Sequence, residues 1–324
     1  MTDFSNINNI NRGGMIDNIK LSLPRCRDMP DISGYLDNGN ENCSMKTGEV
    51  SVYGNVENIK VTQYFGGYSI QGSLPKFLYG NNVCQLTRKE VGLAIEKLSD
   101  RLHLPLDDAD ITKIEVGANI CLAKQHTAYT RLLGDMPRMQ RVSMADSLYY
   151  QGSGRVYPRQ YYFYDKVAEV KKHGGTMPQG LEAANMMRYE MRLNGRLPFQ
   201  LSIPEFKGST LQDRVVYQEL INRWLNGYLS INKLVNMEDE HLKKGMSVKE
   251  AQEVFIAQQI AKGGSSIIDE FIAKLKQNEC FDNRLYYNRV KSNLQKLASK
   301  TKLSVDNGDI EELTAKVKQI AQDS

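Results

Sequence analysis

YPRQYYFYDKVAEVKK (residues 157–172) and MMRYEMRL (residues 186–193) are the two stretches that decide how the chain folds. Along the first stretch Tyr162, Tyr164 and Lys166 alternate, so an extended β-strand places them on one face. Glu169 follows where that strand is expected to give way to a turn or helix. The first stretch therefore predicts a strand that carries two phenols and an amine on the same side.

The second stretch alternates in the same way. Arg188, Glu190 and Arg192 fall between apolar residues and tyrosine, which predicts a strand with one charged face. Pairing the two strands would gather a tyrosine hydroxyl, a lysine, carboxylates and two guanidinium groups on one surface. That set suits chemistry on a phosphodiester, which needs an oxygen nucleophile, carboxylates for a divalent cation, and cations for phosphate.

Composition limits the class of protein. The 324 residues are 41% hydrophobic and 25% charged, which is enough to form a globular core without covalent staples. The five cysteines are scattered without C-x-x-C spacing, so we expect free thiols in a reducing bacterial cytoplasm. Neither an apolar run near 18 residues nor a secretion signal is present, so no membrane partner is expected. The net charge of +4 fits an anionic partner without requiring one.

The remaining elements predict an α+β fold. Residues 1–14 are polar and are expected to form a flexible tail, and strands are expected at 15–24, between 50 and 73, and at 110–120. Helical spacing over 87–102 begins with a capping box formed by Thr87 and Glu90. Without a regular βαβ repeat, the pattern predicts a mainly antiparallel central sheet with helices packed on it, over residues 15–205. Residues 206–324 are predicted to form a helical C-terminal domain that binds DNA or a second copy.

Five motifs in order give the chain a resemblance to a known family. They are MIDNIKLSLP (15–24), SLPKFLYGNNVCQLTRKEVGLAIEKLSD (73–100), DITKIEVGANI (110–120), YYFYDKVAE (161–169) and RYEMRL (188–193). Together they resemble the filamentous-phage replication initiators and the related rolling-circle plasmid initiators of the Rep-trans type. The resemblance covers residues 15–193, and the last 120 or so residues lie outside it.

The resemblance implies a tyrosine nuclease-like fold and a specific activity. Members of this family nick one strand of a supercoiled double-strand origin, join the 5′-phosphate to a tyrosine, and leave a 3′-hydroxyl that primes synthesis. Carried over to this chain, Tyr164 is the nucleophile, and Lys166 and Glu169 belong to the same motif. Glu115 stands where the family usually has aspartate, and Glu190 lies in the R-x-E-x-R strand.

The expected cofactor is Mg²⁺ or Mn²⁺, held by Glu115 and Glu190. None of the four histidines forms a His-hydrophobe-His pair, so a metal site has to rely on carboxylates. Glu169 is a third ligand or orients Lys166, which in turn would lower the pKa of the phenol or bind phosphate.

Each of these side chains also has a structural interpretation. Tyr164 can be a packing residue in a tyrosine-rich strand, and Tyr162 is the main rival nucleophile on the same face. Glu190 can form a plain cross-strand ion pair with a basic residue, and Glu115 can be an edge-strand or solvent-facing acid. Glu169 can be a solvated helix-start glutamate. His126 is interpreted as a packed or surface histidine in preference to a ligand or base.

DNA contacts are expected from arginine and lysine. Arg188 and Arg192 flank Glu190 and can bind neighbouring phosphates, and Arg155 and Arg159 flank a hairpin turn that is predicted at 152–154. The window 283–302 holds Arg289 and Lys291 among six basic residues and no acid, which is typical of a helix that follows a phosphate backbone or of a solvated face.

The sequence therefore predicts a metal-dependent, origin-specific nickase that starts rolling-circle replication of a plasmid or phage. Its expected partner is origin DNA, supercoiled or as a single-stranded hairpin, with a host helicase and a second copy as further partners. Two alternatives stay open. One is a mobilisation relaxase with the same chemistry, and the other is a non-catalytic DNA-binding plasmid regulator in which the carboxylates are ion-paired.

Overall fold

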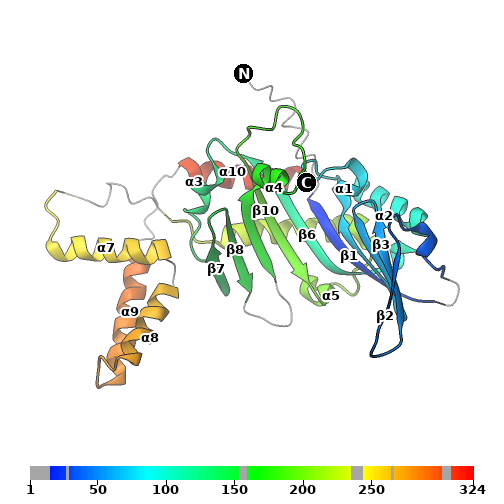
Figure 1. Ribbon diagram of the computed structural model, residues 1–324. Helices are drawn as coiled ribbons and strands as arrows, with labels where there is room; N and C mark the ends of the chain where they lie inside the picture. The colour runs from blue at the N-terminus through cyan, green and yellow to red at the C-terminus, as the bar shows by residue number, and fades with distance from the viewer. Residues whose placement is uncertain (1–14, 27–28, 153–158, 235–243, 264–265, 301–307) are drawn as a thin grey trace.

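The computed structural model describes residues 15–324 except 27–28, 153–158, 235–243, 264–265 and 301–307. Within these residues the chain forms one ten-stranded sheet in the order β2-β3-β4-β5-β1-β6-β10-β9-β8-β7 (Figure 1). All neighbouring strands in this order are antiparallel. The expected α+β class with a mainly antiparallel central sheet is confirmed.

Strands lie in each range where the sequence predicts them, and buried and less buried side chains alternate clearly in β1, β4 and β9. Their bounds are Ile16–Pro24 (β1), Asn40–Cys43 (β2), Val50–Val56 (β3), Ile59–Tyr64 (β4), Gly67–Ser73 (β5), Asp110–Cys121 (β6), Met139–Ser143 (β7), Ser147–Gly152 (β8), Gln160–Asp165 (β9) and Met186–Asn194 (β10). The two strands of the deciding stretches, β9 and β10, are neighbours, and β10 pairs on its other side with β6. The sheet thus brings together segments that are far apart in the sequence.

Ten α-helices lie in the part of the chain that the structure describes. Their bounds are Leu74–Tyr79 (α1), Arg88–Leu102 (α2), His126–Thr130 (α3), Lys166–Lys172 (α4), Leu197–Leu201 (α5), Arg214–Ser230 (α6), Val248–Gly263 (α7), Ser266–Gln277 (α8), Arg284–Lys300 (α9) and Gly308–Asp323 (α10). Short 3-10 turns lie at Ser33–Tyr35, Leu106–Asp108 and Ser209–Gln212. Helix α2 starts with the predicted capping box, in which Thr87 and Glu90 each bond to the other's backbone N–H.

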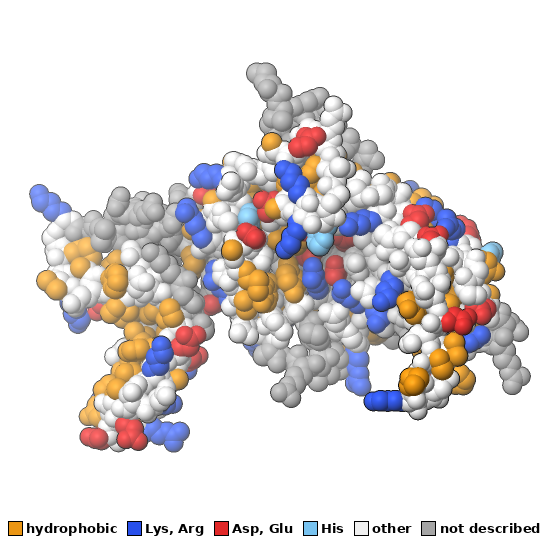
Figure 2. Space-filling model, viewed as in Figure 1, with side chains coloured by type: hydrophobic (Ala, Val, Ile, Leu, Met, Phe, Trp, Pro, Cys, Tyr) orange, Lys and Arg blue, Asp and Glu red, His pale blue; other side chains and the backbone are white. Residues whose placement is uncertain are grey.

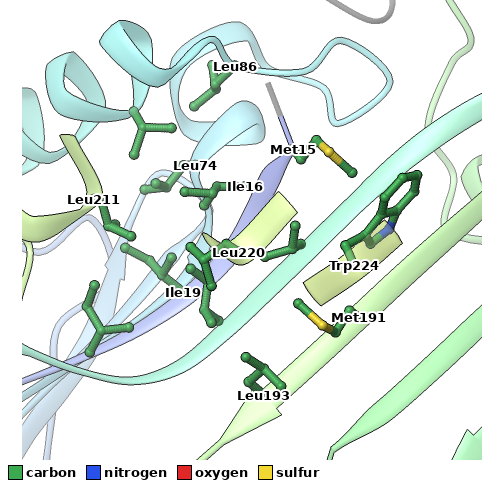
Figure 3. Close-up of a cluster of buried hydrophobic side chains, with 14 of the residues drawn as sticks. Met15, Ile16, Ile19, Leu74, Leu86, Met191, Leu193, Leu211, Leu220 and Trp224 are labelled. Atoms are coloured by element: carbon green, nitrogen blue, oxygen red, sulfur yellow. The ribbon is translucent and has the colours of Figure 1, made fainter. Parts of the chain in front are cut away.

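One face of the sheet is apolar and carries the core. The indole of Trp224 on α6 donates to the carbonyl of Tyr189 on β10 at 3.2 Å, and the Tyr189 hydroxyl donates to the carbonyl of Trp224 at 3.0 Å. Figure 3 shows Trp224 beside Met191 and Leu220, in the same cluster as the apolar residues of β1. Helices α2, α6 and α10 contribute buried residues to this core. The opposite face, which we call the polar face, is covered at one end by α4 (Figure 1).

The helices after residue 205 do not behave as one group. Helices α6 and α10 pack on the apolar face, and the Tyr228 hydroxyl of α6 hydrogen-bonds the Thr314 hydroxyl of α10 at 2.8 Å. Helices α7, α8 and α9 instead pack on one another around their own apolar cluster, to one side of the sheet (Figure 1). The boundary at residue 205 stays a prediction, and these contacts place α6 and α10 with the sheet.

One local expectation is wrong. Strand β9 ends at Asp165, and Lys166 is the first residue of α4 instead of the next residue on the strand face. The Asp165 carboxylate accepts a hydrogen bond from the backbone N–H of Ala168 at 2.9 Å, which caps the helix. A favourable N-cap therefore overrides the strand alternation, and Lys166 reaches the polar face from a helix.

Candidate functional site

The register of β9, β10 and β6 gathers the predicted residues on the polar face. Arg188 lies opposite Tyr164 on β9 and opposite Asn119 on β6, and Glu190 lies opposite Tyr162 and Gly117. Directly opposed residues of a sheet point to the same side. The two deciding stretches therefore pair with their phenols, carboxylate and guanidinium groups together, as the sequence predicts.

Glu190 is the centre of this cluster. Its Oε1 accepts from the Tyr164 hydroxyl at 2.9 Å and from Arg188 Nε at 2.7 Å, while its Oε2 accepts from Arg192 Nη2 at 2.8 Å. The residue is only 2% exposed. Burial alone raises the pKa of Glu190, but the two guanidinium groups outweigh burial and lower the pKa to about 2. Glu190 is thus an ionised carboxylate locked between two cations and a phenol.

Arg188 is held entirely from within the protein. Besides Glu190, its guanidinium donates to Asn119 Oδ1 at 3.0 Å and to Asp17 Oδ2 at 2.5 Å. Asp17 also accepts from the Ser73 hydroxyl at 2.6 Å. Arg188 is 1% exposed and each of its three nitrogens has a partner, so this geometry gives it a positioning role. Its predicted contact with DNA stays a prediction.

Asp17 is a member of the cluster that the sequence reasoning missed. The pairing of β1 with β6 shifts register between Ile16 and Ile19, which is a β-bulge. The bulge lets Asp17 reach the polar face although its neighbours Ile16 and Ile19 are in the core. The one signal in the sequence was a carboxylate inside an otherwise apolar strand, a position that requires a buried partner.

Tyr164 is a neutral phenol in this arrangement. Burial, followed by the negative charge of Glu190, raises the pKa of Tyr164 well above its ordinary value of 10. The rival nucleophile Tyr162 has a different environment, because its hydroxyl donates to the Gln160 amide oxygen at 3.2 Å. Arg192 lies 4.1 Å above the Tyr162 ring, and Tyr149 of β8 stacks against that ring at 5.5 Å. Only Tyr164 of this pair is bonded to the buried carboxylate.

Lys166 and Glu169 form a pair beside the cluster. Lys166 Nζ donates to Glu169 Oε2 at 2.7 Å, and the Lys166 side chain is fully buried. Burial, and then the charge of Arg188, lower the pKa of Lys166 from its ordinary value, against the opposing effect of Glu169. Of the two roles considered for Glu169, this contact corresponds to orienting Lys166.

Glu115 lies next to Glu190 and shares a cation with it. Lys113 Nζ is 2.6 Å and Arg192 Nε is 3.5 Å from Glu115 Oε1. Burial, then the charge of Glu190, raise the pKa of Glu115 despite these two cations. The Arg192 side chain is 28% exposed, so it is the guanidinium of this cluster that solvent reaches.

The carboxylates do not fit a divalent cation as they are arranged. Both oxygens of Glu190 are occupied by guanidinium and phenol donors, and Lys113 and Arg192 occupy the same oxygen of Glu115. In the part of the chain that the structure describes, no three carboxylate, imidazole or thiol side chains converge on one point. A cation would have to displace one of these donors to bind Glu190, and the ligand roles of Glu115, Glu190 and Glu169 stay predictions.

The other predicted DNA ligands are dispersed. Arg159 is exposed immediately before β9, and Arg155 lies outside the described residues. Arg289 is exposed on α9, whereas Lys291 on the same helix forms an ion pair with Asp269 of α8 at 2.6 Å. The structure therefore brings Arg188 and Arg192 to the site and leaves Arg289 and Lys291 on the separate three-helix group.

The buried carboxylate makes stability depend on pH. Because the folded pKa of Glu190 is about 2, below its ordinary value of 4.5, its stabilising effect is complete above pH 4.5 and is lost as the pH falls toward 2. We expect the free energy of unfolding, measured by urea denaturation, to fall over this range. The fall should be shallower in Glu190→Gln, and parallel curves for the two proteins would contradict the assignment.

Comparison with known families agrees with the ordered motifs. The Phage_CRI family model, which describes the N-terminal region of a replication-associated protein, matches residues 15–212, more than half of the chain. The match covers every strand of the sheet and the whole cluster around Glu190. No curated relative matches the chain at a significant level. Among the helices that the structure describes, none combines the length and apolarity needed to cross a bilayer.

Proposed function

The chain belongs to the Phage_CRI family of replication-associated proteins, and we propose that it nicks and rejoins one DNA strand at a replication origin through Tyr164. The observation that supports this most is the 2.9 Å hydrogen bond from the Tyr164 hydroxyl to Glu190. It combines a candidate nucleophile with a proton acceptor among cations on the polar face.

The proposed step exchanges one phosphate ester for another. The phenolic oxygen of Tyr164 bonds to phosphorus, the bond from phosphorus to the 3′-oxygen breaks, and the phenolic proton passes to Glu190. The leaving 3′-oxygen takes a proton from solvent. Because the phosphotyrosine bond keeps the ester energy, the reverse reaction rejoins the DNA without ATP.

Arg192 is the residue that would couple DNA binding to this step. With both guanidinium groups in place, a pKa near 2 makes Glu190 a poor base. The partly exposed Arg192 can turn toward a phosphate, and guanidinium binds phosphate oxygens in a bidentate manner. Glu190 would then lose one of its two counterions, its pKa would rise, and it would accept the Tyr164 proton more readily.

We propose that Mg²⁺ or Mn²⁺ binds at this site only when Arg192 has moved away from the carboxylates. Since Arg192 contacts both Glu190 and Glu115, it competes with a cation for them. We expect Arg192→Gln to bind Mn²⁺ on the order of tenfold more tightly than the wild type, because a nearby positive charge is removed. Mn²⁺ binding is measured by electron paramagnetic resonance without DNA. Unchanged affinity would show that these carboxylates are not the ligands.

A second candidate function has an observation in its favour. If the carboxylates serve only to hold the sheet together, they should be ion-paired, and Glu190 and Glu115 both are. The protein would then bind origin DNA as a non-catalytic replication protein. A mobilisation relaxase with the same tyrosine chemistry would have the same site.

The direct test is incubation with a supercoiled plasmid that carries the cognate origin, with Mg²⁺ or Mn²⁺. A nicked circle with protein joined to the 5′ end supports the endonuclease. Binding without a nick or an adduct supports the non-catalytic candidate.

The exposed Arg289 of α9 is proposed as an additional phosphate contact outside the sheet.

A further inference from the structure

A row of lysines crosses the open part of the polar face. Lys60 of β4 lies opposite Gln71 of β5, Gln71 lies opposite Lys20 of β1, and Lys20 lies opposite Lys113 of β6. Opposed residues share a face, so the three lysines point to the same side as the candidate site. We call this set the lysine row. Its members are 40 and 93 residues apart in sequence, and only the strand order brings them into line.

Lys60 and Lys20 are the two members of the row that lie farther from the candidate site. Lys60 is exposed and Lys20 is partly buried, and neither forms an ion pair with any residue that the structure describes. Gln71, which lies between them, and Asn55 of β3, which lies opposite Lys60, are uncharged, and the other neighbour of Lys20 in the row is Lys113. Figure 2, which looks onto the polar face, shows Lys and Arg side chains gathered across the middle of the sheet. Positive charge that is not ion-paired favours an anionic ligand.

The row leads into the candidate site. Lys113 contacts Glu115 at 2.6 Å, Glu115 is next to Arg192, and Arg192 contacts Glu190 at 2.8 Å. Adjacent β-strands lie about 4.8 Å apart, so the row spans roughly 15 Å from β4 to β6. On the other side of Arg192 the stacked rings of Tyr162 and Tyr149 continue on the same face. A cationic row and an aromatic pair therefore flank the site.

We propose that the lysine row binds the sugar-phosphate backbone of the single DNA strand that enters the site. This inference rests on the proposed function and adds a binding surface to it. A single strand is favoured over a duplex because its unpaired bases can stack on tyrosine, while lysine ammonium groups contact its phosphates without sequence preference. The row would hold the strand across the β-strands and deliver one phosphate to Arg192.

The test compares two double variants of the Tyr164→Phe protein, which keeps the DNA intact. Lys20→Gln with Lys60→Gln removes two charges from the row. Lys89→Gln with Lys318→Gln removes two charges from exposed lysines on α2 and α10, the helices that cover the opposite face. Binding of a fluorescent single-stranded oligonucleotide is measured by anisotropy over a range of salt concentrations.

We expect the row variant to bind on the order of tenfold more weakly at low salt, and its slope of log affinity against log salt to be smaller by about 1.4, since each phosphate contact contributes about 0.7. The control variant should keep the slope of the parent, and Lys20→Arg with Lys60→Arg should bind like the parent. Equal losses in the row and control variants would overturn the proposal. So would a loss on duplex DNA equal to that on the single strand.

This outcome is separable from that of the proposed function. If the salt slope is smaller in the row variant but the wild-type protein forms no adduct, DNA binding by the lysine row is supported and the endonuclease activity is rejected. If the salt slope is unchanged but the wild-type protein forms an adduct, the endonuclease activity is supported and DNA binding by the lysine row is rejected.

Discussion

Tyr164→Phe is expected to form no covalent adduct with origin DNA and to lose nicking by on the order of a thousandfold or more, the scale seen when an enzyme nucleophile is removed. The substitution removes the Tyr164 hydroxyl, which donates a hydrogen bond to Glu190, and leaves the aromatic ring in place. Origin binding should stay within about twofold of the wild type, because the phosphate-binding cations are untouched. Nicking is measured on supercoiled plasmid, and the adduct by gel after denaturation.

Tyr162→Phe is the matched control. It also removes a strand hydroxyl on the same face two residues away, but that hydroxyl contacts the Gln160 amide and no carboxylate. This variant should nick at close to the wild-type rate. Loss of the adduct in Tyr162→Phe, with retention in Tyr164→Phe, would move the nucleophile to Tyr162 and leave the bond to Glu190 as a structural contact.

Arg188→Met is expected to lower the free energy of unfolding by about 3–5 kcal/mol, which is the usual effect of removing one partner from a buried ion pair. Arg188 is the buried cation between the carboxylates of Asp17 and Glu190, and both would lose a charge-assisted hydrogen bond. Arg192→Met is the control, since Arg192 is partly exposed and leaves Arg188 on Glu190. Urea denaturation at neutral pH gives both values.

Neutralising the two carboxylates that lose their partner, Asp17 and Glu190, should restore part of the stability that is lost in Arg188→Met. Adding Asp17→Asn and Glu190→Gln to Arg188→Met should recover a large part of the lost stability, because a buried amide costs less than an unpaired charge. A loss below about 1 kcal/mol in Arg188→Met, or no recovery in the triple variant, would show that the cluster does not depend on Arg188.

Much of the polar face could be predicted from the sequence because its determinants are local. Alternation in 160–165 and 186–194 predicts which side chains of each strand share a face, and the antiparallel pairing seen in the structure puts the two sets on the same side. Lys166 shows where alternation is insufficient. The Asp165 side chain caps α4, so the chain turns into a helix one residue earlier than the strand pattern suggests.

The features that could not be predicted depend on pairings between distant segments. Asp17 reaches Arg188 only because a bulge in β1 shifts its register against β6. Lys20 and Lys60 become neighbours across β5 only in the folded sheet. The sequence showed carboxylates and cations in suitable numbers, but not that each carboxylate oxygen of Glu190 is already occupied by guanidinium and phenol.

The most direct measurement is mass spectrometry of the peptide that stays attached to DNA after the wild-type protein has reacted with a supercoiled origin plasmid and has been digested with trypsin. If Tyr164 is the nucleophile, the 5′-phosphonucleotide mass is on the peptide that contains residues 160–166, and fragmentation places it on Tyr164. Attachment to Tyr162 or to a tyrosine outside β9, or the absence of any DNA-linked peptide from a preparation that binds the origin, would contradict the proposed site.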